Sequence, residues 1–271
     1  MDARRRSLVF PREHGAWGML LVPVATGASV GLLAGGSAWP LLPFCIAALA
    51  VFSLRTPLET WIGTTPVRAR TDAELRLVRN AVFTLAAVSL AALIWLFRGG
   101  RNPDLWWIGS VAAVAFAARA LVKQAWRRGR LAAQMAGAAG LTFAAPAAYS
   151  AVTGHLDPAA WSLWIANLLF AVNQIHYVQL RIHAARAMKP HEKLAAGRGF
   201  LIGQGILMML LVAACAGHLL RWQAGMAFVP VLCRGFAWFG ARGKPLAIHA
   251  LGLSELIHAC AFGVLLVWGI G

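Results

Sequence analysis

The feature that most constrains this chain is a series of apolar runs, each about 20 residues long and nearly free of charge. A helix of that length spans the hydrocarbon layer of a bilayer, which is about 30 Å thick. Hydrophobic residues make up 60% of the 271 residues and charged residues only 13%, too little charge for a surface that faces water on all sides. We therefore expect an integral membrane protein.

Nine such runs can be drawn along the chain. Backbone groups in lipid must be hydrogen-bonded within the protein, which a helix achieves with its own residues. The expected fold is thus all-α, a polytopic transmembrane helical bundle that forms a single integral membrane domain over residues 1–271. The expected spans are 15–35, 38–55, 78–97, 105–122, 132–152, 160–180, 199–220, 223–240 and 246–270.

The basic residues predict the orientation of the bundle. If the N-terminus is cytoplasmic and nine spans follow, all of the 25 Lys and Arg residues except Arg98, Arg101 and Arg221 fall on the cytoplasmic side. Arg234, near the end of its run, is assigned to that side as well. Basic loops are typical of the cytoplasmic face. We expect a multi-pass protein of the bacterial cytoplasmic (inner) membrane whose C-terminus, Gly271, lies outside.

The net charge of +16 also bears on partners. Basic residues that flank spans attract the anionic headgroups of the inner leaflet, so membrane lipids are the expected partners of the cytoplasmic loops. No aromatic and basic motif typical of nucleic-acid binding occurs, and no nucleic acid is expected as a partner.

Function must reside in polar groups that the bilayer makes costly, at about 2.5–3.5 kcal/mol for a charge at helix-centre depth. Glu13 and His14 precede the first span. Arg55 and Glu59 lie at the end of the second span, four residues apart, where they can pair with each other. Each of these groups alone is as compatible with a solvated helix end as with a functional site.

Two later spans carry deeper polar groups. Asn173, His176 and Gln179 recur at helical spacing near the end of the sixth span, with Arg181 beside them. In the ninth span Glu255 and His258 share a face, about 9–14 Å into the membrane from the helix start. Under the predicted topology all these groups lie in the cytoplasmic half of the bundle. The two amides are also compatible with simple bridging between helices.

Four motifs resemble the YwiC-like family of bacterial membrane proteins, over nearly the whole chain. They are PREHGAW at 11–17, RTPL at 55–58, NQIHYVQLR at 173–181 and LGLSELIHA at 251–259. The family has no settled activity, so the resemblance implies a membrane protein but no chemistry.

The layout is also similar to the UbiA prenyltransferase superfamily, and this implies a UbiA-like arrangement of the helices. In that superfamily Asp-rich motifs after the second and sixth spans hold Mg²⁺ and a prenyl diphosphate. The four aspartates of this chain lie at 2, 72, 104 and 157, and none falls in LRTPLE or NQIHYVQLRIH. We therefore expect neither a Mg²⁺–diphosphate site nor ordinary prenyl transfer.

Three functions fit these residues, and the first is favoured narrowly. In the first, a transition metal is held by a mixture of carboxylate and imidazole groups, as in metal sites of helical bundles. The protein would then be a metal-dependent membrane enzyme acting on a lipid-soluble molecule such as a quinone, isoprenoid or lipid. The candidate metal ligands are Glu13, His14, His176, Glu255 and His258, and the candidate catalytic residues are Glu255, His258, His176 and Glu59.

In the second function, arginine forks hold the head group of a lipid or isoprenoid directly, without Mg²⁺. The candidate binding residues are Arg55, Arg181, Asn173 and Gln179. The protein would then be a transferase or a lipid-binding protein. In the third, Glu255, His258 and His176 relay protons in a transporter.

Overall fold

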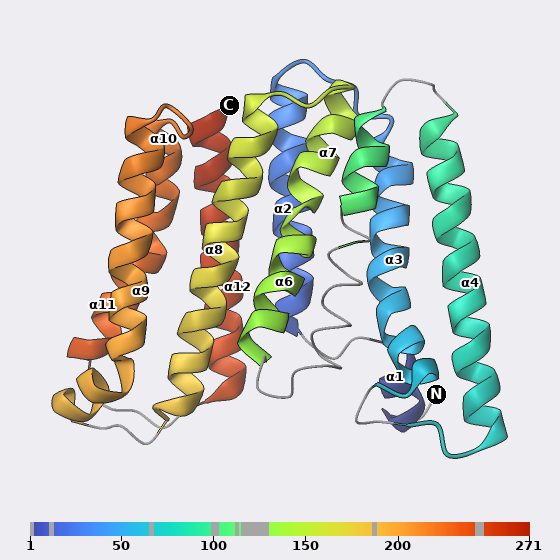
Figure 1. The fold of residues 1–271 in the computed structure, drawn as a ribbon, viewed down its shortest axis with the longest axis horizontal. Coiled ribbons are helices and arrows are strands. Elements are labelled where there is room, and N and C mark those ends of the chain that lie inside the picture. Colours follow the sequence, from blue (N-terminus) through green and yellow to red (C-terminus); the bar gives the residue numbers. More distant parts are fainter. Residues whose placement is uncertain are drawn as a thin grey trace.

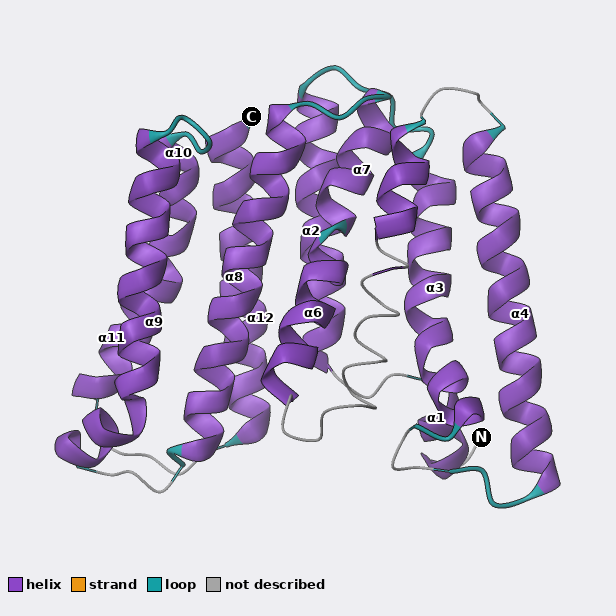
Figure 2. Ribbon diagram, in the orientation of Figure 1, coloured by secondary structure: helices purple, strands orange, loops and turns teal. Residues whose placement is uncertain are grey.

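The computed structural model describes residues 3–10, 14–64, 68–98, 103–111, 114, 130–185, 189–241 and 247–271. Within these ranges the regular structure is helical and no strand occurs (Figure 2). The expected all-α fold is confirmed for the described part of the chain.

The helices run alternately up and down through one bundle, and the N- and C-termini lie at opposite ends of it (Figure 1). The helices are α1 (Ala3–Val9), α2 (His14–Leu33), α3 (Leu41–Ile62), α4 (Asp72–Phe97), α6 (Arg130–Thr142), α7 (Ala144–Thr153), α8 (Pro158–His183), α9 (Pro190–Ala216), α10 (Trp222–Gly225), α11 (Val229–Gly240) and α12 (Ile248–Ile270). A single 3₁₀ turn, Met226–Phe228, joins α10 to α11.

Five helices among the described residues are long and apolar enough to cross a membrane. They are α3 (Leu41–Ile62), α4 (Asp72–Phe97), α9 (Pro190–Ala216), α12 (Ile248–Ile270) and the stretch Gln134–Thr153, which combines most of α6 with α7. Trp17–Leu33 is a shorter apolar helix. Most of the expected span 105–122 lies outside the described residues, and every other expected span coincides with helix. The count of nine spans therefore stays a prediction.

Helices α2 and α7 touch at the middle of the bundle. A Cβ added at Gly27 would stand 2.0 Å from the carbonyl oxygen of Ala145, so the contact between these helices requires glycine. The break between α6 and α7 has a local cause, because Pro146 cannot donate a hydrogen bond to the carbonyl of Thr142 and its ring clashes with it.

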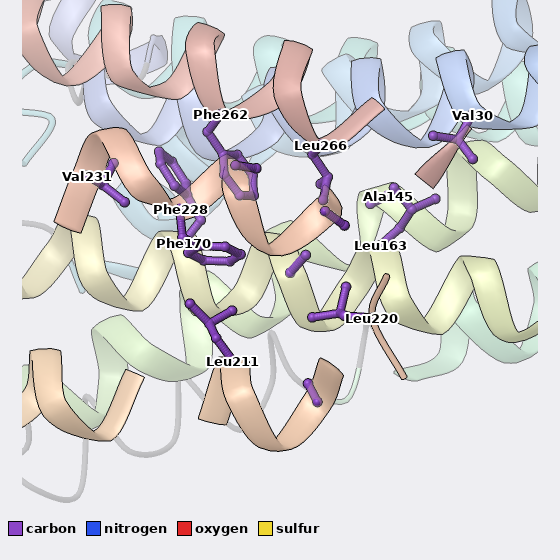
Figure 3. Packing of buried hydrophobic residues seen from close by; sticks show 14 of the residues in the cluster. Val30, Ala145, Leu163, Phe170, Leu211, Leu220, Phe228, Val231, Phe262 and Leu266 are labelled. Atoms are coloured by element: carbon purple, nitrogen blue, oxygen red, sulfur yellow. The ribbon is translucent and has the colours of Figure 1, made fainter. Parts of the chain in front are cut away.

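The largest apolar core gathers residues of α2, α7, α8, α9, α10, α11 and α12 and of the turn before α11 (Figure 3). Phe170 of α8 and Phe262 of α12 stack with their ring centroids 4.1 Å apart, and Phe228 meets Phe262 edge to face. These aromatic contacts fix α8 against α12. They also bring the residues that follow Phe170 by one or two turns on α8 to the same level as those that precede Phe262 by one or two turns on α12.

The opposite side of the bundle is built differently. Helix α4 packs mainly on α3 and forms the edge of the bundle in Figure 1, and only 17% of its most apolar stretch is buried. The short helix α1 lies against the lower ends of both. Its Leu8 and Val9 are buried with Val78 of α4.

Candidate functional site

A buried ion pair joins α11 to α12. Nη1 of Arg234 lies 2.5 Å from Oε1 of Glu255, and each side chain is only 9% exposed. Glu255 lies about 10 Å from the first residue of α12, at 1.5 Å per residue. Removing both charges from water costs several kcal/mol per ion, and the attraction within the pair offsets this only when the geometry is good.

Helix α8 supplies an aromatic contact to this pair. The guanidinium carbon of Arg234 stands 4.1 Å from the centroid of the buried Tyr177 ring, where the face of the ring attracts a cation. On the same helix Nη1 of Arg181 donates to the Tyr177 hydroxyl at 3.3 Å. Tyr177 therefore contacts two arginines, one from its own helix and one from α11.

Two amide contacts extend the polar region to α9. Nε2 of Gln204 donates to Oδ1 of Asn173 at 2.7 Å, and Nε2 of Gln174 donates to the backbone oxygen of Glu255 at 3.2 Å. A Cβ at Gly235, next to Arg234, would stand 3.4 Å from Oε1 of Gln204, so α11 approaches α9 at this level. We call the set Asn173, Gln174, Tyr177, Gln204, Arg234 and Glu255 the polar centre.

The polar centre keeps unused hydrogen-bonding capacity. Four buried atoms of the polar centre have no hydrogen-bond partner among the described residues, namely Nδ2 of Asn173, Oε1 of Gln204, Nε of Arg234 and Oε2 of Glu255. Two of them are donors and two are acceptors. Leaving such an atom unsatisfied costs about 1–3 kcal/mol, and buried polar groups are rarely left so without a reason.

Two of the three candidate histidines, His176 and His258, lie beside the polar centre rather than in it. The His176 ring lies against Phe200, with centroids 5.4 Å apart, and next to Gly203 of α9. Nδ1 of His258 lies 2.7 Å from the backbone oxygen of Ser254 in its own helix. Each ring is thus engaged by its neighbours on α9 or α12.

Arg55 and Glu59 occupy a different part of the fold. The expected pairing is confirmed, with Nε of Arg55 3.2 Å from Oε1 of Glu59 and side-chain exposures of 17% and 19%. Their helix, α3, packs against α1, α4 and α7. The candidate residue Gln179 donates to Gln134 of α6 at 2.5 Å. The structure therefore distributes the candidate residues over more than one place.

The candidate metal ligands are only partly among the described residues. Glu13 lies outside the described residues, as does the side chain of His14. In the part of the chain that is described, no three His, Cys, Asp or Glu side chains lie close enough together to hold a metal ion. The metal site stays a prediction that depends on Glu13 and His14.

Two cavities lie away from the polar centre. One of about 480 Å³ lies between α1 and α4 and is lined by Arg5, Ala73, Arg76, Leu77 and Asn80. Another of about 250 Å³ lies at the other end of the bundle, where the hydroxyl of Tyr149 donates to Asp157 at 2.5 Å.

Sequence reasoning missed four members of the polar centre, namely Gln174, Tyr177, Gln204 and Arg234. Arg234 was counted with the cytoplasmic loops, but the structure buries it within α11 against Glu255. A lone arginine inside VPVLCRGFAWFG is the signal that could have identified it. Gln204 carries the same kind of signal, because it is a polar residue in an apolar run. Tyr177 carries no such signal because tyrosine is common in membrane helices.

With this geometry established, comparison with known proteins places the chain. The model of the YwiC-like protein family matches residues 10–149, which is more than half of the chain. The chain belongs to the YwiC-like family. Protein YwiC of Bacillus subtilis (strain 168), named as uncharacterised, is 23% identical over 257 residues, which cover 94% of this chain and 95% of that protein.

The family match bears unevenly on the two sites. Residues 10–149 include PREHGAW and the Arg55–Glu59 pair, whereas every member of the polar centre follows residue 149. No solved structure matches the chain, so the UbiA-like arrangement stays a prediction. The YwiC-like family assignment expected from the motifs is confirmed.

Proposed function

We propose that this YwiC-like protein binds the polar end of a lipid-soluble molecule at the polar centre. The observation that carries the proposal is the buried Arg234–Glu255 pair, each partner of which keeps a hydrogen-bonding atom without a partner among the described residues. Ionisable residues within a membrane bundle are costly and are typical of functional sites. The polar centre also draws on four helices, and the space between the helices of a bundle is a common place for ligand sites.

The free atoms indicate the chemistry of the ligand. Nε of Arg234 and Nδ2 of Asn173 offer donors to a carbonyl oxygen, while Oε2 of Glu255 and Oε1 of Gln204 accept from a hydroxyl group. The charges of Arg234 and Glu255 balance each other, so the centre suits an uncharged head group. A quinone or quinol, or another isoprenoid with carbonyl and hydroxyl groups, has this chemistry.

The proposal is tested with the protein purified in mild detergent. We expect a lipid-soluble compound to copurify and to be identified by mass spectrometry, or a short-chain quinone or quinol to raise the melting temperature. Gln204→Leu should abolish either effect, because it removes the amide that meets Asn173. Gln179→Leu is the matched control, since Gln179 bonds to Gln134 away from the centre. Equal binding by both variants, or no binding by the wild type, would contradict the proposal.

The same preparation separates this function from a metal-dependent enzyme. The metal hypothesis requires Glu13, His14, His176, Glu255 and His258 to hold a transition metal, and Glu59 to assist. Elemental analysis that finds one metal per chain, lost in His14→Ala and His258→Ala, would favour the enzyme. Metal below stoichiometry in the wild type would leave the binding function.

One observation favours a second candidate, a proton-coupled transporter. The Arg234–Glu255 pair joins two helices, and a proton taken up at Oε2 of Glu255 would weaken that link. In proteoliposomes loaded with a pH-sensitive dye, this function predicts proton entry under a membrane potential and its loss in Glu255→Gln. Equal entry with the wild type and with empty vesicles would exclude it.

We also propose that the protein crosses the bacterial cytoplasmic membrane nine times, with the N-terminus inside. The support is the asymmetry of the basic residues together with the alternating helix directions in Figure 1. Reporter fusions at residue 190 and at Gly271 should report cytoplasmic and external positions respectively. Both reporters on one side would contradict the three spans expected after residue 190, and with them the count of nine.

A further inference from the structure

The cavity between α1 and α4 has a basic lining that the proposed function does not use. Its volume is about 480 Å³, within the range of about 300–1,000 Å³ typical of small-molecule sites. Arg5 comes from α1 and Arg76 from the first turns of α4, and none of the five lining residues is acidic. The cavity therefore gathers two positive charges from two helices.

The α1 wall of this cavity is held in place by several contacts. Nε of Arg4 lies 2.8 Å from Oε1 of Glu74, and Nη2 of Arg4 donates to the backbone oxygen of Arg68 at 3.3 Å. The hydrogen bond to Glu74 raises the pKa of Arg4 above its ordinary value. The hydroxyl of Thr60 donates to the backbone oxygen of Leu8 at 3.3 Å. Arg4 thus holds α1 against α4, whereas Arg5 lines the cavity.

Arg5 and Arg76 differ from Arg4 in that no described residue serves them as a counter-ion. Both side chains are exposed, and neither makes a hydrogen bond or ion pair with another described residue. Two like charges that line one cavity repel each other unless an anion lies between them. The planar fork of a guanidinium group matches the oxygens of a phosphate, which two such forks can bind together.

The outer face of α4 indicates what the phosphate is attached to. Leu77 forms part of the cavity lining, and beyond it α4 exposes large apolar side chains toward the surroundings of the bundle. Those exposed by more than 40% include Phe83, Leu90, Ile94 and Trp95. A phosphate group at Arg5 and Arg76 would therefore stand at the polar end of an apolar surface long enough for an acyl chain, which spans about half of the roughly 30 Å hydrocarbon layer.

We propose that this cavity binds the phosphate of an anionic phospholipid headgroup, with the acyl chains along α4. The site lies at the end of α4 that the predicted topology places in the inner leaflet, where anionic lipids are abundant. It is independent of the polar centre, since α4 packs on α3 and α1 rather than on α8, α9, α11 or α12.

The test uses the full chain in nanodiscs or detergent and compares matched double variants. The probes are phosphatidylglycerol, phosphatidylcholine and soluble glycerol phosphate, read out by native mass spectrometry and by the shift of melting temperature. Wild type should retain phosphatidylglycerol in preference to phosphatidylcholine. Arg5→Ala with Arg76→Ala should lower that preference by about tenfold or more, since each arginine near an anionic surface is worth about 1 kcal/mol.

Arg6→Ala with Arg79→Ala is the control, because both residues are exposed and neither lines the cavity. It should keep the wild-type preference. Arg5→Lys with Arg76→Lys keeps the charge without the fork and should give an intermediate loss while preserving the fold. Equal losses in the two alanine pairs would show general attraction to a basic surface and overturn the proposal. Displacement of the lipid by glycerol phosphate at equal concentration would assign the site to a free phosphate instead.

Discussion

The ion pairs on the two sides of this bundle have the same chemistry in opposite settings. Arg234 and Glu255 come from different helices and are 9% exposed, whereas Arg55 and Glu59 lie on one helix at 17% and 19% exposure. A buried pair contributes little net stability because desolvation offsets its attraction. The comparison therefore suggests that the pair in the polar centre is kept for a function, whereas the pair on α3 fits a local structural role.

The surroundings of the two regions differ in the same way. The polar centre lies next to an aromatic core in which Phe228 and Phe262 are fully buried. On the α4 side, Leu8, Val9 and Val78 form a small core at one end, Leu96 and Phe97 pack on a second core at the other, and only 17% of the most apolar stretch of α4 is buried. One side is thus built to enclose a polar group, and the other to present a surface to the bilayer.

Arg234→Ala should have the largest effect on this comparison. Removing the guanidinium leaves the buried carboxylate of Glu255 unpaired, which costs about 3–5 kcal/mol of unfolding free energy. Thermal and denaturant unfolding of the purified protein in detergent would measure the loss. Arg79→Ala, at an exposed position of α4, should change stability by less than about 0.5 kcal/mol. Equal effects of the two variants would show that Arg234 is solvated.

Arg55→Ala should destabilise the protein less, by on the order of 1 kcal/mol. The pair that it weakens joins two positions of one helix, and its side chains are more exposed than those of Arg234 and Glu255. The same unfolding assay, run in parallel with Arg234→Ala, gives the ratio of the two losses. A loss as large as that of Arg234→Ala would mean that the α3 pair matters as much for stability as the pair in the polar centre. The contrast between the two sides would then disappear.

Gly203→Ala should have a smaller effect that is confined to the α8–α9 contact. The added Cβ would stand 2.9 Å from Nδ1 of His176, an atom at the end of a side chain that can move aside. We expect a loss below about 1 kcal/mol and weaker binding of a quinone probe, because His176 is one turn from Asn173. Gly199→Ala on the same helix meets no atom within 4 Å and should be neutral or slightly stabilising. Identical stability and binding of both variants would show that the position of His176 does not affect the site.

The helices could be predicted from the sequence because the length of each apolar run in the sequence predicts the length of a helix. The expected span 223–240 corresponds to α10, the 3₁₀ turn and α11, which begin at Trp222 and end at Gly240. The break at Phe143 was not predicted, since Pro146 stands within an otherwise continuous run of small apolar residues. A single proline inside a membrane run ends or kinks a helix only as its neighbours allow.

The candidate site was predicted only in part. Glu255 and Asn173 were identified because polar residues deep in apolar runs are costly, and the structure joins both to the polar centre. Their partners were missed because partnership is a property of packing between helices. Spacing along one helix places residues on a common face but does not show which helix covers that face, so Arg234 could not be assigned to Glu255.

The last test separates the stability of the polar centre from its function. Arg234→Met combined with Glu255→Leu replaces the charged pair by apolar side chains of similar volume, and such replacements are often neutral or stabilising. We expect unfolding free energy within about 1 kcal/mol of the wild type, although Arg234→Ala alone is costly. Binding of a quinone or of the copurified lipid should nevertheless be lost, because the free donor on Arg234 and the free acceptor on Glu255 are gone. If instead the double variant were as unstable as the single one, the pair would be a structural link between α11 and α12. A stable double variant that still binds would place the ligand elsewhere in the bundle.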